Sequence, residues 1–309
     1  MLPYCLVLDN AVSNAILSEL AKTVTIIDER AALEKAVADK IGVAVASPMK
    51  GVEEIWFDRL SALKLIAVNG VGTDRINLAK ARSHGIDVTT TLNILTEDVA
   101  DLAFALLLAV TRKVTLADRF IRYGRWAEGQ LFPLGTSLRG KKLGIVGLGA
   151  IGCEIAKRGE AFGMLPRYYN RTLKTDVSWP HYATPVELAT DSDVLVVAIS
   201  ATPETVHSIN SDVFTALGAG GYIINIARGS IINESDLIGA LKNNTIAGAG
   251  LDVFLDEPHI NAAFLALDNA VLTPHVGSAT VETRTRMGQC VIDNVNAVIG
   301  GEKPINIVN

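Results

Sequence analysis

Cysteine is scarce in this chain of 309 residues, with Cys5, Cys153 and Cys290 far apart in the sequence. An odd, widely spaced set without a paired motif does not build a disulfide framework or a cysteine-based zinc site. The spacing of the histidines and acidic residues suggests no metal site either. We therefore expect reduced thiols, no bound metal and a cytoplasmic protein.

The chain also lacks an excess of basic residues and a long apolar run. Its 28 Lys and Arg against 33 Asp and Glu give a net charge of −5, which disfavours binding to nucleic acid or to an anionic membrane surface. The most apolar run, residues 102–110, is about half the ~20 residues that span a membrane. That run predicts a buried helix, and we expect neither a nucleic acid nor a membrane as a partner.

Hydrophobic residues are abundant, at 49%, and fall into short runs separated by segments of helical character. Continuous Val, Ile and Leu runs are typical of strands buried on both faces of a parallel sheet. Two series of strands are predicted, one at residues 4–8, 23–27, 42–46 and 64–69, the other at 141–147, 167–170, 193–199, 221–227, 247–253 and 270–274. The predicted fold class is α/β, with two Rossmann-like or flavodoxin-like domains that each contain a parallel sheet.

The joint between the two series is predicted at a long helix that begins near Thr96, a suitable N-cap followed by acidic residues. A last helix, ending at Gly300, is expected to return to the first domain. The ligand cleft is expected between the domains. The predicted division is 1–96 plus 281–309 for a substrate-binding domain and 97–280 for a dinucleotide-binding domain.

Residues 144–152, GIVGLGAIG, place three glycines in a GxGxxG pattern between a predicted strand and a predicted helix. Gly147 allows a tight turn, Gly149 lets a pyrophosphate approach the backbone, and Gly152 lets the helix pack on the strand. Amides at the start of the helix, at Ala150 and Ile151, favour anions. The pattern predicts dinucleotide binding, and the alternatives are a flavin, S-adenosylmethionine or a tight turn without a ligand.

The next predicted strand ends at Asn170, Arg171 and Thr172, where dinucleotide-binding chains usually carry Asp or Glu. A carboxylate there binds the adenosine ribose and repels a 2′-phosphate, and Asn170 removes that repulsion. The Arg171 fork and the Thr172 hydroxyl suit phosphate oxygens. We predict NADP(H) as the preferred cofactor and NAD(H) as the second; a solvated loop arginine is the alternative. Pro166 is expected at the first residue of this strand, where no ladder donor is needed.

An Arg, a Glu and a His lie near the predicted ends of later strands, where open α/β sheets bind ligands. Glu257 and His275 form an acid–base pair, in which the carboxylate orients the imidazole and favours its protonated form. Arg228 suits a substrate carboxylate and the neighbouring carbonyl. Each residue alone has a structural alternative: Arg228 as a strand cap, Glu257 as a loop start, and His275 as a satisfied loop histidine.

Together these features resemble the D-isomer-specific 2-hydroxyacid dehydrogenases nearly from end to end. Within that family, YYNRT (168–172) is most similar to the NADPH-dependent glyoxylate/hydroxypyruvate reductases and the hydroxyphenylpyruvate reductases. The resemblance implies hydride transfer that reduces a small 2-oxo acid to a D-2-hydroxy acid. The matching segments are VNGVGTDRINL (68–78), LTEDVADLAFALLL (95–108), GKKLGIVGLGAIG (140–152), NIARGSIINESDLIGAL (225–241), GAGLDVFLDEP (248–258) and LTPHVGSAT (272–280).

The resemblance also implies roles for individual residues. Arg228 would bind the 2-oxo acid, His275 would donate a proton to its carbonyl oxygen, and Glu257 would keep His275 protonated and correctly turned. The amides of Val71 and Gly72 would hold the substrate carboxylate. Asp252 would bond the nicotinamide amide. The other cofactor-binding residues implied are Thr96, Ile199, Ser200, Ile226, His275 and Gly277.

Two segments leave questions open. Where the family usually reads close to NTPGVLT, this chain has TTLNILT (90–96), with Leu92 and Asn93 in place of Pro and Gly. Asn tolerates left-handed backbone, so the loop is expected to survive, but the choice among glyoxylate, hydroxypyruvate and phenylpyruvate-type acids stays open. The resemblance implies that residues 124–135 form an arm that packs on a second subunit, in a homodimer built through the nucleotide-binding domain. The interface or pocket-wall candidates on this arm are Trp126, Leu131 and Phe132.

Two other functions remain open from the sequence. A dinucleotide-sensing binding protein of the corepressor type shares the fold and the Arg, Glu and His set, and another NAD-dependent enzyme of the family is the second alternative. Formate dehydrogenases of this family pair the His with Gln, so Glu257 favours proton transfer to a carbonyl. The histidines without a partner pattern, expected on the surface or in loops, are His84, His181, His207 and His259.

Overall fold

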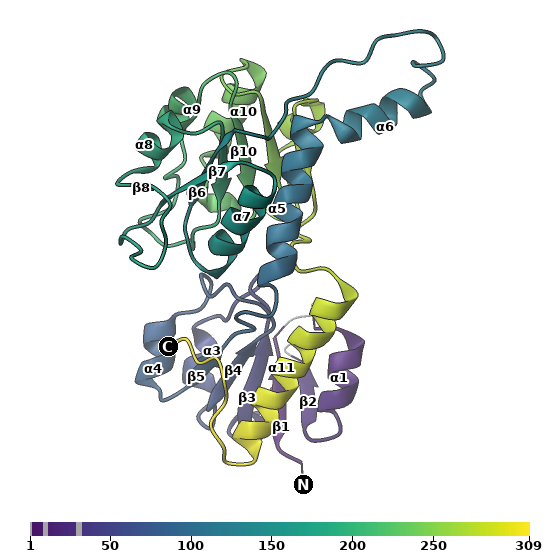
Figure 1. Cartoon of the computed structure of the whole chain (residues 1–309). Helices are drawn as coiled ribbons and strands as arrows, with labels where there is room; N and C mark the ends of the chain where they lie inside the picture. The colour runs from purple at the N-terminus through teal and green to yellow at the C-terminus, as the bar shows by residue number, and fades with distance from the viewer. Residues whose placement is uncertain (1, 9–11, 29–32) are drawn as a thin grey trace. The chain divides into compact units, whose positions relative to one another are not determined.

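The computed structural model describes residues 2–8, 12–28 and 33–309 (Figure 1). The chain divides into two compact units, which we describe separately. Unit 1 comprises Met1–Leu95 and Ala279–Asn309, and unit 2 comprises Thr96–Ser278. The predicted boundaries, after residues 96 and 280, lie one and two residues beyond those of the structure. The roles assigned to the two parts and the cleft between them stay predictions.

Unit 1 contains one parallel sheet with the strand order β2-β1-β3-β4-β5 in its described residues. The predicted strands correspond to β1 to β4, and β5 was missed. Its three residues, DVT, include one apolar side chain, too short a pattern to predict a strand. The elements are β1 (Tyr4–Val7), α1 (Asn14–Leu20), β2 (Thr25–Asp28), α2 (Lys35–Ala38), β3 (Ile41–Ala46), α3 (Ile55–Arg59), β4 (Leu65–Val68), α4 (Leu78–Ser83), β5 (Asp87–Thr89) and α11 (Val281–Ile299).

Helices cover both faces of this sheet, which explains why its strands are continuous apolar runs. On one face, Trp56 and Phe57 of α3 belong to the same buried cluster as Leu6 and Ile66. On the other face, the last helix, α11, packs with α1 against the sheet, and Val291 is among its buried residues. The terminal Asn309 then bonds to β5: its Oδ1 accepts a hydrogen bond from the Val88 amide at 2.8 Å.

Unit 2 contains a seven-stranded parallel sheet in the order β12-β11-β10-β9-β6-β7-β8 among the described residues. The chain order reverses at β6, and open α/β sheets bind ligands at the carboxyl ends of the strands beside such a point. The elements are α5 (Thr96–Thr111), α6 (Val114–Arg122), β6 (Lys142–Val146), α7 (Ala150–Ala161), β7 (Leu165–Tyr169), β8 (His181–Tyr182), α8 (Pro185–Thr190), β9 (Val194–Val197), α9 (Ser211–Leu217), β10 (Tyr222–Asn225), η1 (Gly229–Ile231), α10 (Glu234–Lys242), β11 (Gly248–Leu251), η2 (Ala262–Ala266) and β12 (Ala270–Leu272).

Pro166 is the second residue of β7, not the first as predicted. The amide of Leu165 donates toward β6, whereas the amide of Tyr168 donates to Pro180 O on the β8 side. Position 166 therefore directs its missing amide toward the β8 side as well. Since β8 pairs with β7 at Tyr168 and Tyr169, no ladder bond is lost at Pro166.

The apolar run predicted as a buried helix is α5, which begins at Thr96 itself rather than after it. It packs closely on β11 because that strand carries glycines: a Cβ on Gly250 would lie 2.9 Å from the Cβ of Leu106, and one on Gly248 would lie 2.8 Å from Val110. Of the helices in the described residues, none is both long and apolar enough to cross a membrane.

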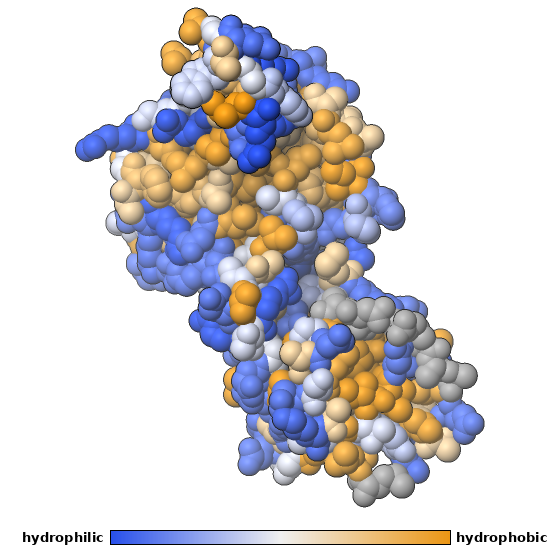
Figure 2. Space-filling view, turned by 90° about the vertical axis from the view of Figure 1, so that its right-hand side faces the viewer, coloured by the Kyte–Doolittle hydropathy of each residue, from blue (hydrophilic) through white to orange (hydrophobic). Residues whose placement is uncertain are grey.

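The segment after α5 differs from the rest of unit 2. Helix α6 has no buried residue among those described, and it projects from the body of the unit together with the following loop (Figure 1). In this arm, which we define as residues 114–137, Leu131 and Leu134 are 95% and 92% exposed. Figure 2 shows a broad apolar area on unit 2 below the projecting segment. An arm of this kind has apolar surface to bury.

Candidate active site

The glycine loop joins β6 to α7 at the edge where the strand order reverses. Gly147 has a left-handed φ of +101°, and a Cβ there would lie 2.6 Å from the backbone of Ile199. A Cβ on Gly152 would lie 2.2 Å from Gly147 O, so the helix can approach the loop because this residue is glycine. Around Gly149, by contrast, the described residues leave a Cβ position open within 4 Å. The loop is therefore closed at two glycines and open at the one where a ligand would approach.

Helix α7 directs its first amides at this opening. Its N-cap is Gly149, and its first helical hydrogen bond runs from Cys153 N to Gly149 O at 2.9 Å. The amides of the first turn, including those of Ala150 and Ile151, have no partner within the helix, and the helix dipole adds positive potential there. Gly149 and Ala150 are exposed. This arrangement suits the pyrophosphate of a dinucleotide.

Asn170 has a role beyond the one predicted from the sequence. Its Oδ1 accepts a hydrogen bond from Leu148 N at 2.6 Å, so its side chain holds the glycine loop against the end of β7. Its carbonyl oxygen lies 3.0 Å from His181 Nε2. His181 was expected to be a surface or loop histidine, but it lies in β8 and packs against the ring of Tyr168. The strand is two residues long, which explains why its pattern was not recognised.

Arg171 and Thr172 are exposed in the loop that follows Asn170. The pKa of Glu204 is lowered, first by a hydrogen bond with Thr202 and, to a smaller degree, by the positive charge of Arg171. Glu204 lies in the segment that follows β9, and the same segment contains Ile199 and Ser200. The two segments predicted to flank the adenosine follow β7 and β9, the two neighbours of β6, at the carboxyl edge of the sheet.

His275 and Glu257 form a hydrogen-bonded pair after β12 and β11. His275 Nδ1 lies 2.7 Å from Glu257 Oε2, and the second carboxylate oxygen accepts a hydrogen bond from Phe254 N at 2.9 Å. Burial raises the pKa of Glu257, but these two hydrogen bonds and the positive charges of His275 and Arg228 together hold it below its usual range. Glu257 is therefore ionised at neutral pH and orients the imidazole.

Arg228 lies at the carboxyl end of β10, close enough for its charge to contribute to the lowered pKa of Glu257. One guanidinium nitrogen donates to Ala227 O at 2.7 Å. The turn is held by Asn225, whose Nδ2 donates to Arg228 O at 3.0 Å and whose Oδ1 accepts from Ala227 N at 3.1 Å. Ile226, predicted to lie near the nicotinamide, is buried in this turn.

Asp252 holds the loop that carries His275. Its carboxylate accepts hydrogen bonds from Thr273 Oγ1 at 2.6 Å, Val276 N at 2.8 Å and Gly277 N at 2.9 Å. Asp252 is 2% exposed, and its carbonyl oxygen accepts a further bond from His275 N at 2.9 Å. The resemblance implied a bond to nicotinamide; the structure adds a loop-anchoring role, which depends on contacts over more than 20 residues and has no local sequence signal.

The other predicted residues lie at the starts of loops and helices. Val71 and Gly72 are half-buried in the unit 1 loop after β4, and Thr96 is the first residue of α5 in unit 2. Asn93 has a left-handed φ of 66°, which agrees with the expectation that Asn can replace Gly there. The parts of these residues in substrate and cofactor binding stay predictions.

Comparison with known proteins gives the family of this chain. Residues 104–277 match the model of the D-isomer specific 2-hydroxyacid dehydrogenase, NAD binding domain. Glyoxylate/hydroxypyruvate reductase A of Arabidopsis thaliana is 44% identical over 89% of this chain and 87% of its own length. 2-Ketogluconate reductase of Gluconobacter oxydans is 48% identical over 85% of this chain and 84% of its own.

A solved structure extends the similarity to the whole chain. The NADPH-dependent glyoxylate/hydroxypyruvate reductase of Sinorhizobium meliloti, in complex with NADP and malonate, superposes with a TM-score of 0.93 at 37% identity. The alignment covers 100% of this chain and 97% of that one. The chain therefore belongs to the family of D-isomer specific 2-hydroxyacid dehydrogenases, which are oxidoreductases.

Proposed function

We propose that this enzyme reduces small 2-oxo acids to D-2-hydroxy acids with NADPH, and that His275 is the proton donor. The observation that carries the proposal is the hydrogen bond of 2.7 Å between His275 Nδ1 and Glu257 Oε2, formed beside Arg228. The pair and Arg228 follow β10, β11 and β12, at the same edge of the sheet as the glycine loop. A carbonyl held at this edge would meet an acid and a cation together.

The chain supplies proton transfer, orientation and charge. Bound NADPH would supply the hydride, which adds to the carbonyl carbon of the 2-oxo acid. Because Glu257 engages Nδ1, His275 gives the proton from Nε2 to the carbonyl oxygen, and the reaction is balanced as one hydride and one proton. Arg228 binds the carboxylate and polarises the carbonyl. In unit 1, the amides of Val71 and Gly72 are assigned to substrate binding.

The preference for NADPH is assigned to Arg171. It is exposed beside the open glycine loop, and Asn170 carries no negative charge that would repel a 2′-phosphate. The Sinorhizobium meliloti relative is described as NADPH-dependent and was solved with NADP. Replacing Arg171 by Ala is expected to lower kcat/KM with NADPH by roughly 10- to 100-fold, the loss of one charge-assisted contact to phosphate. The value of kcat/KM with NADH is the internal control. An unchanged ratio of kcat/KM with NADPH to that with NADH would indicate that Arg171 is only a solvated loop residue.

The test of the reaction is a set of initial rates with glyoxylate, hydroxypyruvate, phenylpyruvate and 2-ketogluconate, each with NADPH and with NADH. The last acid is included because of the Gluconobacter oxydans relative. His275→Ala should lower kcat by about 10²- to 10⁴-fold, the usual contribution of a general acid, and Arg228→Ala should raise KM as well. His84→Ala, an exposed histidine in unit 1, is the control.

Two outcomes would redirect the assignment. Normal turnover in His275→Ala would remove the proton-donor role. Absence of turnover with every acid, together with tight binding of NADPH, would favour a dinucleotide-sensing binding protein of the corepressor type.

We further propose that the enzyme is a homodimer built through unit 2. The support is the arm, which exposes Leu131, Leu134 and Trp126 at 95%, 92% and 70%. Isolated exposed apolar side chains are common, but several on one projecting segment mark an association surface. A second copy that covers the arm would bury them.

A further inference from the structure

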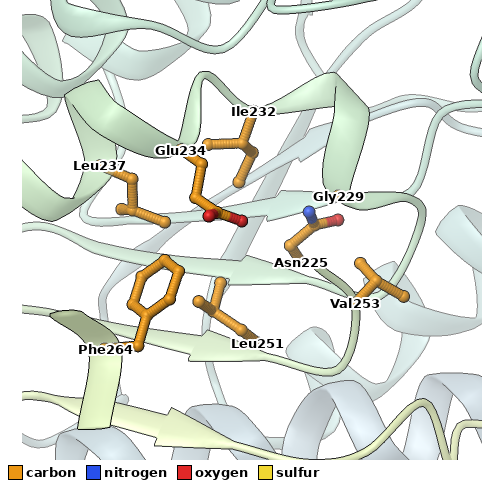
Figure 3. Close-up of a pocket in the computed structure, with 8 residues that line it drawn as sticks. All are labelled: Asn225, Gly229, Ile232, Glu234, Leu237, Leu251, Val253 and Phe264. Atoms are coloured by element: carbon orange, nitrogen blue, oxygen red, sulfur yellow. The ribbon is translucent and has the colours of Figure 1, made fainter. Parts of the chain in front are cut away.

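Glu234 is a carboxylate next to the loop after β11, and it has no part in the mechanism above. It is the first residue of α10, directly after the N-cap Asn233 and three residues after the end of η1. Figure 3 shows its side chain turned into a small pocket between η1, α10 and the sheet, which Leu251 and Phe264 line from the opposite side. Its Oε2 accepts a hydrogen bond from Leu255 N at 3.2 Å. The bond ties the start of α10 to the loop after β11.

Gly229 holds the same peptide group from another direction. A Cβ on Gly229 would lie 2.0 Å from Phe254 C, 2.2 Å from Phe254 O and 2.4 Å from Leu255 N. The backbone of η1 therefore packs directly on the peptide that joins Phe254 to Leu255. One peptide group is fixed by the backbone of Gly229 and by the carboxylate of Glu234.

The peptide group before it, between Val253 and Phe254, bonds to the acid–base pair. The amide of Phe254 donates to Glu257 Oε1 at 2.9 Å, and Glu257 Oε2 lies 2.7 Å from His275 Nδ1. Gly229 also follows Arg228 directly in the chain. The contact between η1 and residues 254–255 therefore lies between Arg228 and the loop that carries Glu257.

We propose that Glu234 is a positioning residue for the reaction: it holds residues 254–255 against η1 and so sets Glu257, and through Glu257 the ring of His275, relative to Arg228. The proposal rests on the proposed function of these three residues. In this proposal Glu234 acts through Glu257 and does not contact the substrate or the cofactor. A displacement of about 1 Å in a catalytic group lowers a rate by up to roughly 100-fold, so a loop clamp of this kind affects turnover.

The test compares Glu234→Leu, Glu234→Gln and Asp236→Ala in the full-length enzyme. Leu removes the acceptor, whereas Gln keeps an oxygen that can accept from Leu255 N. Asp236 is a matched control, because it lies in the same turn of α10 and accepts a hydrogen bond from Ser211 N at 3.0 Å, away from the catalytic loops. Glu234→Leu should lower kcat by about 10- to 100-fold with an unchanged Kd for NADPH. Glu234→Gln should recover kcat to within about threefold of the wild type, and Asp236→Ala should not lower it.

Amide hydrogen exchange separates this proposal from the proposed function. Exchange at Leu255 and Phe254 should be faster in Glu234→Leu than in the wild type and in Asp236→Ala, whether or not a substrate is turned over. If the wild type reduces no 2-oxo acid, the proposed function fails while the exchange result still tests the clamp. Unchanged exchange, equal losses of kcat in Glu234→Leu and Asp236→Ala, or faster exchange with normal kcat would overturn the positioning role.

Discussion

Individual positions of the glycine loop require glycine for different physical reasons, and substitutions can distinguish these reasons. Gly149→Ala should leave the free energy of unfolding within about 0.5 kcal/mol of the wild type, since a Cβ there meets open space. The added methyl group should nevertheless weaken NADPH binding by 10-fold or more, a loss of about 1.4 kcal/mol, because a pyrophosphate must approach this backbone closely.

Gly152→Ala should show the opposite pattern. Its Cβ would lie 2.2 Å from Gly147 O, and backbone at that distance has to move, at a cost of roughly 1–3 kcal/mol of stability. Urea unfolding and fluorescence titration with NADPH measure both quantities for each variant. Equal effects of the two substitutions on stability would contradict the difference between Gly149, where a Cβ has space, and Gly152, where it meets backbone.

Residue types and spacing were sufficient to locate Arg228, Glu257 and His275 at strand ends, because parallel strands bring their carboxyl ends to one edge. The bond of 2.7 Å between Glu257 and His275 is the geometry that such a pair requires. The contacts that support these residues could not be predicted from the sequence. Glu234 meets Leu255 across 21 residues of sequence, through a hydrogen bond to a backbone amide that has no side-chain signature.

Among the elements, β6, β7 and β8 are joined by one carboxylate that follows α8. Asp191 binds Lys142, Arg167 and Tyr182, one side chain from each strand. The hydrogen bonds from Lys142 and then Tyr182, with the charges of Arg167 and Lys142, lower the pKa of Asp191 below its ordinary value of 3.8 although burial opposes them. The Arg167 side chain is 8% exposed, so its charge depends on this partner.

Asp191→Asn should therefore destabilise unit 2 at neutral pH by about 2 kcal/mol, less than a fully buried pair because Asp191 and Lys142 are partly solvated. Since the folded pKa is lower than the unfolded one, the contribution of Asp191 is present above pH 3.8 and is lost as the pH falls through the folded value. Urea unfolding should show the same difference in the free energy of unfolding between the wild type and Asp191→Asn at pH 7 and at pH 5. At pH 3.5 this difference should be smaller. A difference in the free energy of unfolding that stays constant at all three pH values would rule out the ion pairs of Asp191 as its cause.

The elements that the sequence analysis recovered are those with long apolar runs, such as the buried strands β6 and β10 and the helix α5. The elements that it missed, β5 and β8, are three and two residues long at the sheet edges. An edge strand is defined by the neighbour with which it pairs, and that neighbour comes from distant sequence. Asn309 bonded to β5 and His181 bonded to Asn170 O are examples.

For the whole molecule, the arm leads to a prediction about assembly. Replacing Leu131 and Leu134 together by Glu removes two apolar side chains per subunit, which makes four per dimer. Burial of a leucine contributes about 1.5–3 kcal/mol, so the four together contribute about 6 kcal/mol at the lower value, or about 10⁴-fold in the dissociation constant. Sedimentation velocity should give a dimer for the wild type and a monomer for the double variant. Leu265→Glu, which changes a leucine that is 72% exposed in η2, should remain a dimer. A monomeric wild type, or dissociation of the Leu265 variant to the same degree, would show that the arm is not the interface.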